Sequence, residues 1–259
     1  MLTTSVRRQL GLSLVELMVG SAVGLIVLTA VLTTYVTIAR GSGDILASAK
    51  LHAELRAAMD MLVHDIRRAG SWTALFEERT GEEGSALPNP YTQRAGSLVT
   101  DINILDGGKA IQFSFNGSFL GADDGSVFGY RFSDKAIKVL QCNINPDAPT
   151  ACNTGSLVGT GWEKLTDDNT VILEDLSFMT KGSSCHNWAT NTTWVIAADS
   201  TTPACDPAAS GYAATSGNRL LEKRLINVKL EGRLKERADF IMRLEQAVYV
   251  ANDRSFPAP

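Results

Sequence analysis

The sequence predicts an α+β protein in which one long N-terminal helix packs on an antiparallel β-sheet. An uncharged apolar run covers residues 17–39, and an amphipathic helical pattern follows at residues 55–66. Apolar and polar residues then alternate in the C-terminal part, as they do in strands that bury one face. Helical segments followed by a run of strands are typical of the α+β class.

The uncharged run is long enough to cross a membrane. More than about 18 apolar or neutral residues in a row indicate a membrane-spanning helix rather than a core helix. A secretory signal would instead have an apolar region of about 7–15 residues followed by a small-x-small cleavage site. Arg7 and Arg8 precede the run with no acid before Glu16. The positive-inside rule therefore predicts a single pass through a membrane, with the N-terminus in the cytoplasm.

Glu16 is an acid at membrane depth, where a carboxylate costs roughly 2.5–3.5 kcal/mol on insertion scales. One interpretation is an interfacial residue that reaches back to the head groups. The other is a charge whose partner appears only after processing. Cleavage after Gly11 would free an amine on Leu12, one helical turn from Glu16, and the amine of a neighbouring subunit could then neutralise this carboxylate in an assembly.

Residues 11–19, Gly-Leu-Ser-Leu-Val-Glu-Leu-Met-Val, resemble the class III signal of type IV prepilins and pseudopilins. This resemblance implies a pilin-like fold, cleavage by a prepilin peptidase between Gly11 and Leu12, and N-methylation of Leu12. It also makes Glu16 the fifth residue of the mature chain. Most members carry Phe or Met where this chain has Leu12, which keeps the apolar character. The signal covers only the first 40 residues.

The predicted organisation has four parts. They are a leader at 1–11, a transmembrane helix at 12–40, a periplasmic stem helix at 41–70 and a β-rich head at 71–259. Gly41 and Gly43 between the two helical parts weaken a helix and predict a bend or a local melt, while a plain loop is the alternative. In the stem, Leu55, Met59, Leu62 and Ile66 have the spacing of one helical face.

The head of about 190 residues is large enough for one globular domain. Without the leader the chain loses two of its 24 basic residues and keeps all 28 acidic ones, for a net charge of −6, which argues against a nucleic-acid partner. Its four cysteines lie in the exported part, where oxidation allows three pairings. The sequential pairing is favoured because each bridge then closes a short polar loop: Cys142 with Cys152, and Cys185 with Cys205.

Strand patterns are clearest near the C-terminus. Apolar residues alternate with polar ones at 226–235 and again at 240–250. Earlier strand candidates are residues 110–116, 127–132, 136–141 and 171–179. The connection Ser133-Asp134-Lys135 has the length and polarity of a turn, so it predicts a hairpin. Segments 77–96 and 187–217 carry the Gly, Pro, Ser and Thr that predict loops.

A finer resemblance is to minor pilins of the PilW type. Residues 64–72, His-Asp-Ile-Arg-Arg-Ala-Gly-Ser-Trp, resemble the end of their stem helix, hairpin 130–139 their central hairpin, and segments 224–228 and 248–254 their last two strands. The resemblance implies a subunit that combines with other minor pilins, primes polymerisation of the major pilin and stays at the pilus tip, often with a large adhesin. The alternative within this class is a GspJ-like minor pseudopilin of type II secretion.

A different class, a membrane-anchored periplasmic enzyme or binding domain, would have no use for Glu16 or a Gly-terminated basic leader. Catalysis, a cofactor and a metal are not expected. His52 and His64 lie on the predicted stem helix, and His186 with Cys185 and Cys205 would hold zinc only if both thiols were free. Residues 123–126 and 167–169 are rich in acids but lack the alternating spacing of a calcium loop, so polar turns are the better interpretation.

Overall fold

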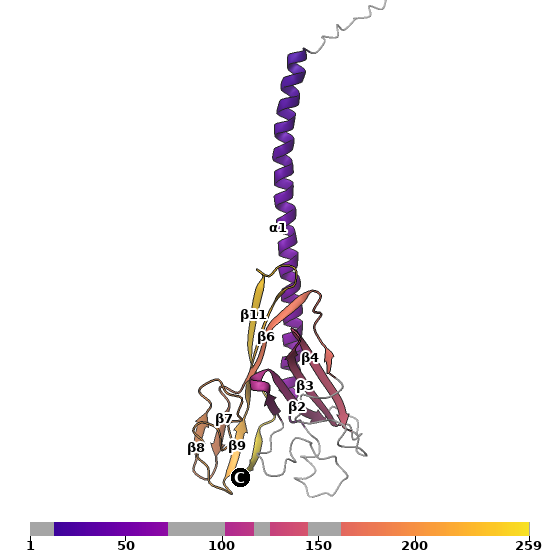
Figure 1. Cartoon of the computed structure of the whole chain (residues 1–259). Helices are drawn as coiled ribbons and strands as arrows, with labels where there is room; N and C mark the ends of the chain where they lie inside the picture. Colours follow the sequence, from indigo (N-terminus) through magenta and orange to yellow (C-terminus); the bar gives the residue numbers. More distant parts are fainter. Residues whose placement is uncertain (1–12, 72–101, 117–124, 145–161, 259) are drawn as a thin grey trace, which may run out of the picture. The chain divides into compact units, whose positions relative to one another are not determined.

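The computed structural model describes residues 13–71, 102–116, 125–144 and 162–258 (Figure 1). One long helix is followed by short and medium strands. The elements in chain order are α1 (Leu14–Arg68), β1 (Ile102–Leu105), the 3-10 turn η1 (Asp106–Gly108), β2 (Ala110–Asn116), β3 (Gly125–Ser133), β4 (Ala136–Ile144), β5 (Trp162–Lys164), β6 (Val171–Met179), β7 (Ser184–Asn187), β8 (Thr192–Val195), β9 (Arg219–Lys223), β10 (Leu225–Leu234), β11 (Ile241–Tyr249) and β12 (Arg254–Pro257). The predicted α+β class is confirmed.

The chain forms two units, Met1–Ala49 and Lys50–Pro259, so the division falls inside α1. The reason is that the helix joins the core of the second unit from Leu51 onward. In this part the predicted face is confirmed, because Leu55, Met59, Leu62 and Ile66 are at most 3% exposed. Close packing of this face is visible at Gly232, where an added Cβ would lie 3.0 Å from Leu55 Cδ2.

The predicted local melt at residues 41–43 is wrong, and so is the alternative of a loop, since α1 is helical throughout these residues. A glycine costs a helix only about 1 kcal/mol relative to alanine. The helix has 55 residues and tolerates this cost, because good helix formers surround the glycines and the stretch after Leu51 is packed. The helix ends where the sequence predicts, since Gly70 has φ 77°, the left-handed conformation of a C-terminal stop.

Three antiparallel sheets form the second unit. A five-stranded sheet has the order β1-β2-β3-β4-β5, a three-stranded sheet has β11-β10-β6, and a four-stranded sheet has β12-β9-β7-β8. The first two adjoin at β6, where the N–H of Leu173 donates to Lys135 O at 3.0 Å. The four-stranded sheet is joined to the three-stranded sheet along the chain, because only Arg224 separates β9 from β10.

The predicted hairpin is confirmed as β3–β4, with Ser133 paired to Ala136 across the turn. Asp134 and Lys135 both have positive φ, 55° and 58°. This is the pattern of a type I′ turn, whose twist matches that of the flanking strands.

The predicted loop 187–217 is wrong in part, because β8 lies within it. This strand has four residues and buries only Trp194, which is too short a pattern to show alternation. The other predicted loop, 77–96, lies outside the described residues. The segment 248–254, taken as one final strand, is divided between β11 and β12, which belong to different sheets.

Candidate functional site

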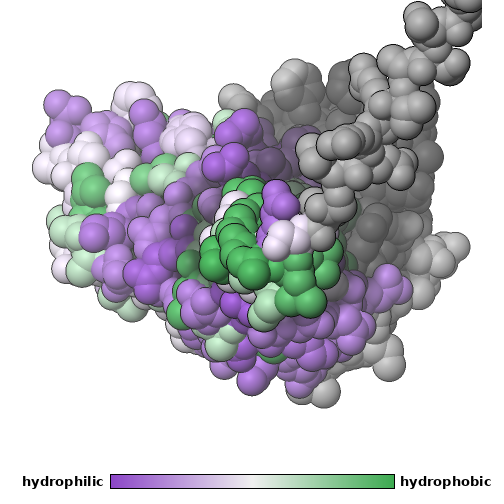
Figure 2. Space-filling view, turned by 90° about the horizontal axis from the view of Figure 1, so that it is seen from above, coloured by the Kyte–Doolittle hydropathy of each residue, from purple (hydrophilic) through white to green (hydrophobic). Residues whose placement is uncertain are grey.

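The first unit contains a helix surface that is apolar all round. Large apolar side chains between Leu14 and Ile38 are 43–74% exposed, and this surface shows as a green area in Figure 2. The helix is long and apolar enough to cross a membrane. Such a surface is stable only in lipid or against other apolar helices.

The serine and threonine hydroxyls of this segment are satisfied within the helix. Ser21 Oγ donates to Met18 O at 2.9 Å, and Thr29 Oγ1 donates to Ile26 O at 2.8 Å. Thr33, Thr34 and Thr37 bond in the same way to carbonyls one turn back. These bonds matter because hydrocarbon offers no partner to a polar group.

Glu16 lies in the first turn of α1. The backbone N–H groups of Glu16 and Leu17 donate to Ser13 O at 3.0 and 3.1 Å, so Ser13 occupies the N-cap position. Ser13 and Glu16 have the S-x-x-E spacing of a capping box, and a carboxylate in the first turn also complements the helix dipole. The position of Glu16 in the first turn therefore favours the helix through its dipole, an effect that was not predicted above. Gly11 and Leu12 lie outside the described residues.

Within the second unit, polar contacts attach the end of α1 to the strands. Tyr130 OH donates to Asp65 Oδ2 at 2.5 Å. Burial, with the hydrogen bond and charge of Asp65, raises the pKa of the Tyr130 hydroxyl, so it remains a donor. Beyond Asp65, Gly70 N donates to Ser114 O at 2.9 Å and Asn252 Nδ2 donates to Ala69 O at 3.2 Å.

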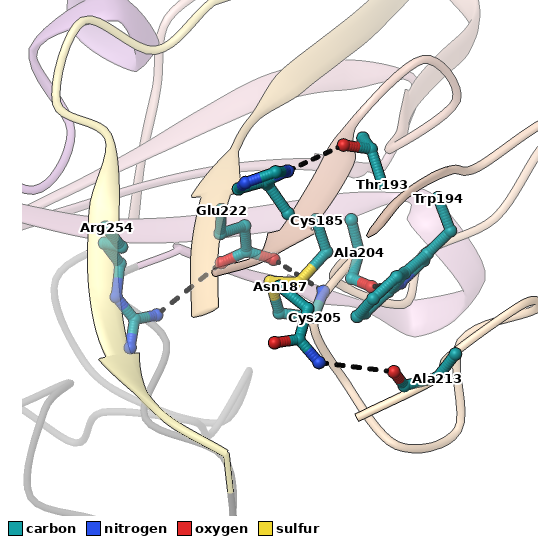
Figure 3. Close-up of a disulfide and its surroundings, with 10 residues drawn as sticks. Cys185, Asn187, Thr193, Trp194, Ala204, Cys205, Ala213, Glu222 and Arg254 are labelled. Atoms are coloured by element: carbon teal, nitrogen blue, oxygen red, sulfur yellow. Dashed lines mark hydrogen bonds and ion pairs between the residues drawn. A yellow bond between two sulfur atoms is a disulfide. The ribbon is translucent and has the colours of Figure 1, made fainter. Parts of the chain in front are cut away.

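Residues 180–223 and 254–258 form what we call the disulfide lobe. Cys185 and Cys205 are bridged, with their Cα atoms 5.1 Å apart. Trp194 packs beside the bridge in the same core cluster, and its Nε1 donates to Ala204 O at 2.7 Å (Figure 3). The predicted pairing of Cys185 with Cys205 is thus present. The other predicted bridge cannot be described, since Cys152 lies outside the described residues.

A buried carboxylate stands next to the bridge. Glu222 Oε1 accepts from the N–H of Cys205 at 3.2 Å, and Glu222 Oε2 lies 3.9 Å from Arg254 Nη1 (Figure 3). Burial raises the pKa of the Glu222 carboxyl, although Arg254 and the backbone donors oppose the shift. Burial also lowers the pKa of the neighbouring Arg224 to about 9. The hydrogen bond to Glu222 holds the loop that carries Cys205 against β9.

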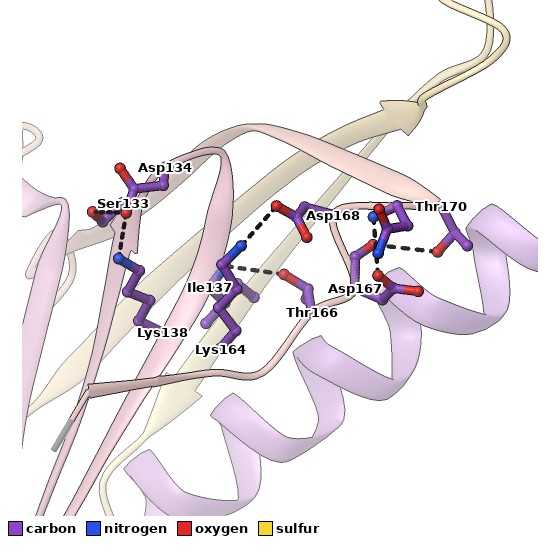
Figure 4. Close-up of polar contacts among 10 residues, drawn as sticks. Ser133, Asp134, Ile137, Lys138, Lys164, Thr166, Asp167, Asp168 and Thr170 are labelled. Atoms are coloured by element: carbon purple, nitrogen blue, oxygen red, sulfur yellow. Dashed lines mark hydrogen bonds and ion pairs between the residues drawn. The ribbon is translucent and has the colours of Figure 1, made fainter.

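The acidic turn at 167–169 is joined to its surroundings by hydrogen bonds. Asp168 Oδ2 accepts from Lys164 Nζ at 2.7 Å, and Asp167 Oδ1 accepts from Asn169 N at 2.9 Å (Figure 4). Thr170 Oγ1 donates to Glu54 on α1 at 3.1 Å. These carboxylates tie the turn to β5 and α1. The other acidic segment, 123–126, is described only in part.

The histidines occupy separate places. His52 and His64 are exposed on α1, and His186 Nδ1 lies 2.8 Å from Thr193 Oγ1. Cys185 and Cys205, the thiols that would accompany His186 in a zinc site, are joined to each other. Among the described residues, no three His, Cys, Asp or Glu side chains are grouped so that they could hold a metal ion.

A β-rich α+β unit with a long, exposed, apolar N-terminal helix defines a protein of the pilin-like class. The family model of prepilin peptidase-dependent protein B matches residues 44–250, and the chain belongs to this family. The match begins after the apolar run, so it is independent of the resemblance of residues 11–19 to a prepilin signal. Neither the curated proteins nor the solved structures contain a significant match to the chain.

Proposed function

We propose that this chain is a minor pilin that helps to prime assembly of a type IV pilus and remains in its tip complex. The observation that carries the proposal is the exposed apolar surface of α1, which begins within a prepilin-type signal and has a single acid in its first turn. Membership of the prepilin peptidase-dependent family supports it. The role is that of a structural subunit and not of an enzyme.

In this proposal the leader 1–11 stays in the cytoplasm while the helix inserts into the inner membrane. Prepilin peptidase then cuts after Gly11 and Leu12 is methylated. Within the complex, Glu16 pairs with the terminal amine of a neighbouring subunit, because two groups that are each costly in hydrocarbon neutralise one another. The partners are other minor pilins, the major pilin and a tip adhesin.

Mass spectrometry of the chain from cells with and without prepilin peptidase tests the processing step. We expect a mature chain that starts at a methylated Leu12, and only in cells with the peptidase. Gly11→Leu should block the cut, whereas the matched change Leu10→Ala should leave it unaffected. A chain that still begins at Met1 in wild-type cells would contradict the proposal.

Deletion of the chain tests the pathway. We expect a loss of surface pili that is restored by the wild-type chain. Normal piliation together with a loss of protein secretion would instead assign the chain to a type II secretion system.

A further inference from the structure

The outer face of the four-stranded sheet differs from the rest of the second unit in its charge. Side chains alternate between the two faces of a strand, and Cys185, Trp194 and Glu222 point into the lobe core. The register therefore places their neighbours on the opposite face. We call this surface the basic face. It includes His186, Trp188, Val195, Arg219, Leu221 and Lys223.

The charged residues on the basic face are cations. Arg219 and Lys223 are exposed, and Arg219 Nε donates to Ser255 Oγ at 3.0 Å. None of the residues that the register places on this face is an acid, and no ion pair of Arg219 or Lys223 is present in the described part of the chain. This local surplus of positive charge occurs in a chain whose overall charge is negative.

The outer side of the three-stranded sheet provides the comparison. There Arg243 pairs with Glu231 at 2.7 Å, Arg233 with Glu174 at 2.5 Å, and Lys229 with Asp175 at 3.2 Å. Cations on that sheet are balanced by acids of the same chain. The basic face has no such balance, so an acidic group of another molecule would neutralise its positive charge.

Two apolar side chains on the basic face are exposed, Trp188 by 59% and Val195 by 53%. Trp188 is held at both its backbone and its ring. The backbone N–H donates to Arg219 O at 3.0 Å, and the ring packs edge-on against His186 with centroids 5.1 Å apart. A fixed Trp beside Arg is the composition of a binding hot spot, because little side-chain entropy is lost on contact.

We infer that the basic face docks an acidic surface of a neighbouring pilin-like subunit. Four strands about 4.8 Å apart, each about 15 Å long, give a face of roughly 200 Å². This area is much smaller than the roughly 800 Å² per partner of a stable independent interface. A contact of this size is sufficient when another interaction already holds the partner nearby. The helix α1 supplies that interaction if the chain is a pilin subunit, so this inference rests on the proposed function.

Photo-crosslinking of the full chain in cells tests the inference. A benzoyl-phenylalanine replaces Val195 on the basic face, Ala247 as an exposed control on β11, or Val23 on the apolar helix. We expect crosslinks to pilin-like subunits from positions 195 and 23, and much weaker ones from position 247. A missing crosslink at 23 would overturn the proposed function, whereas a crosslink at 23 with none at 195 would overturn the docking surface alone.

Charge variants show whether a crosslink at position 195 depends on an acidic partner or only on the proximity of another subunit. The double change Arg219→Glu with Lys223→Glu should lower the crosslink yield at 195 by roughly tenfold. The matched change Arg219→Lys with Lys223→Arg should preserve it, and a non-reducing gel checks that the Cys185–Cys205 bridge is intact in both. An unchanged yield after charge reversal, or a product that contains a polysaccharide and no second protein, would overturn the inference.

Discussion

Removal of the Cys185–Cys205 bridge gives the sharpest test of how the disulfide lobe is held together. Both cysteines are fully buried in the core cluster around Trp194. Alanine is therefore the appropriate replacement at both positions, because buried serine hydroxyls would add a separate cost. The expected effect of the double change Cys185→Ala with Cys205→Ala is a loss of lobe stability without loss of the fold.

The magnitude follows from the loop that the bridge closes. The two cysteines are separated by 20 residues, and the chain-entropy model gives about 3 kcal/mol for a loop of this length. An energy of this size corresponds to a change on the order of 100-fold in an equilibrium constant. The Trp194–Ala204 and Glu222–Cys205 hydrogen bonds remain after the substitution, so we expect the lobe to fold and to open more often.

Hydrogen exchange on the full chain in mild detergent measures this opening. Amides of β7, β8 and β9 should exchange on the order of 100-fold faster in the double variant, while those of β2 and β3 remain unchanged. The wild-type chain after reduction should match the variant. A change below about 1 kcal/mol would show that the bridge does not limit opening of the lobe.

Three further predictions concern single side chains. Glu16→Gln keeps the S-x-x-E/Q spacing and removes the charge. If charge pairing is the function, this variant should insert normally and fail to co-purify with partner minor pilins, as Glu16→Ala should. Normal complex formation by Glu16→Gln would contradict charge pairing. Burial by itself would raise the pKa of Asp175, but two lysines hold it below its ordinary value, so its stabilising contribution is present above about pH 4 and is lost as the pH falls through the lowered pKa. In urea unfolding followed against pH, Asp175→Asn should therefore be less stable than wild type at pH 7. This difference should shrink as the pH falls through the lowered pKa, and equal stability of the two proteins at pH 7 would contradict the prediction. Tyr130→Phe leaves Asp65 without the donor seen at 2.5 Å and should cost about 1–3 kcal/mol in the same assay, whereas a neutral result would mean that water replaces the hydroxyl.

Patterns confined to one segment were predictable from the sequence. The helical face of α1 at Leu55–Ile66 and the strands Ala110–Asn116 and Val171–Met179 follow from periodicity alone, and these segments lie where predicted. The β3–β4 hairpin was predictable as well, because its turn and both strands are adjacent in sequence. Such elements depend on neighbours a few residues away, which a sequence displays directly.

The four-stranded sheet was decided by tertiary structure. Its strands have four or five residues each, and β12 pairs with β9 across more than 30 residues of sequence. That pairing brings Arg254 to Glu222. The pairing of β7 with β9 adds His186 to the face on which Arg219 and Lys223 already lie by alternation. The cysteines by themselves allowed three pairings, and the fold brings Cys185 to Cys205. The sequence determined the long apolar helix and the longer strands, because an apolar run and a periodicity are both local. The lobe depends on long-range pairing that no local pattern encodes.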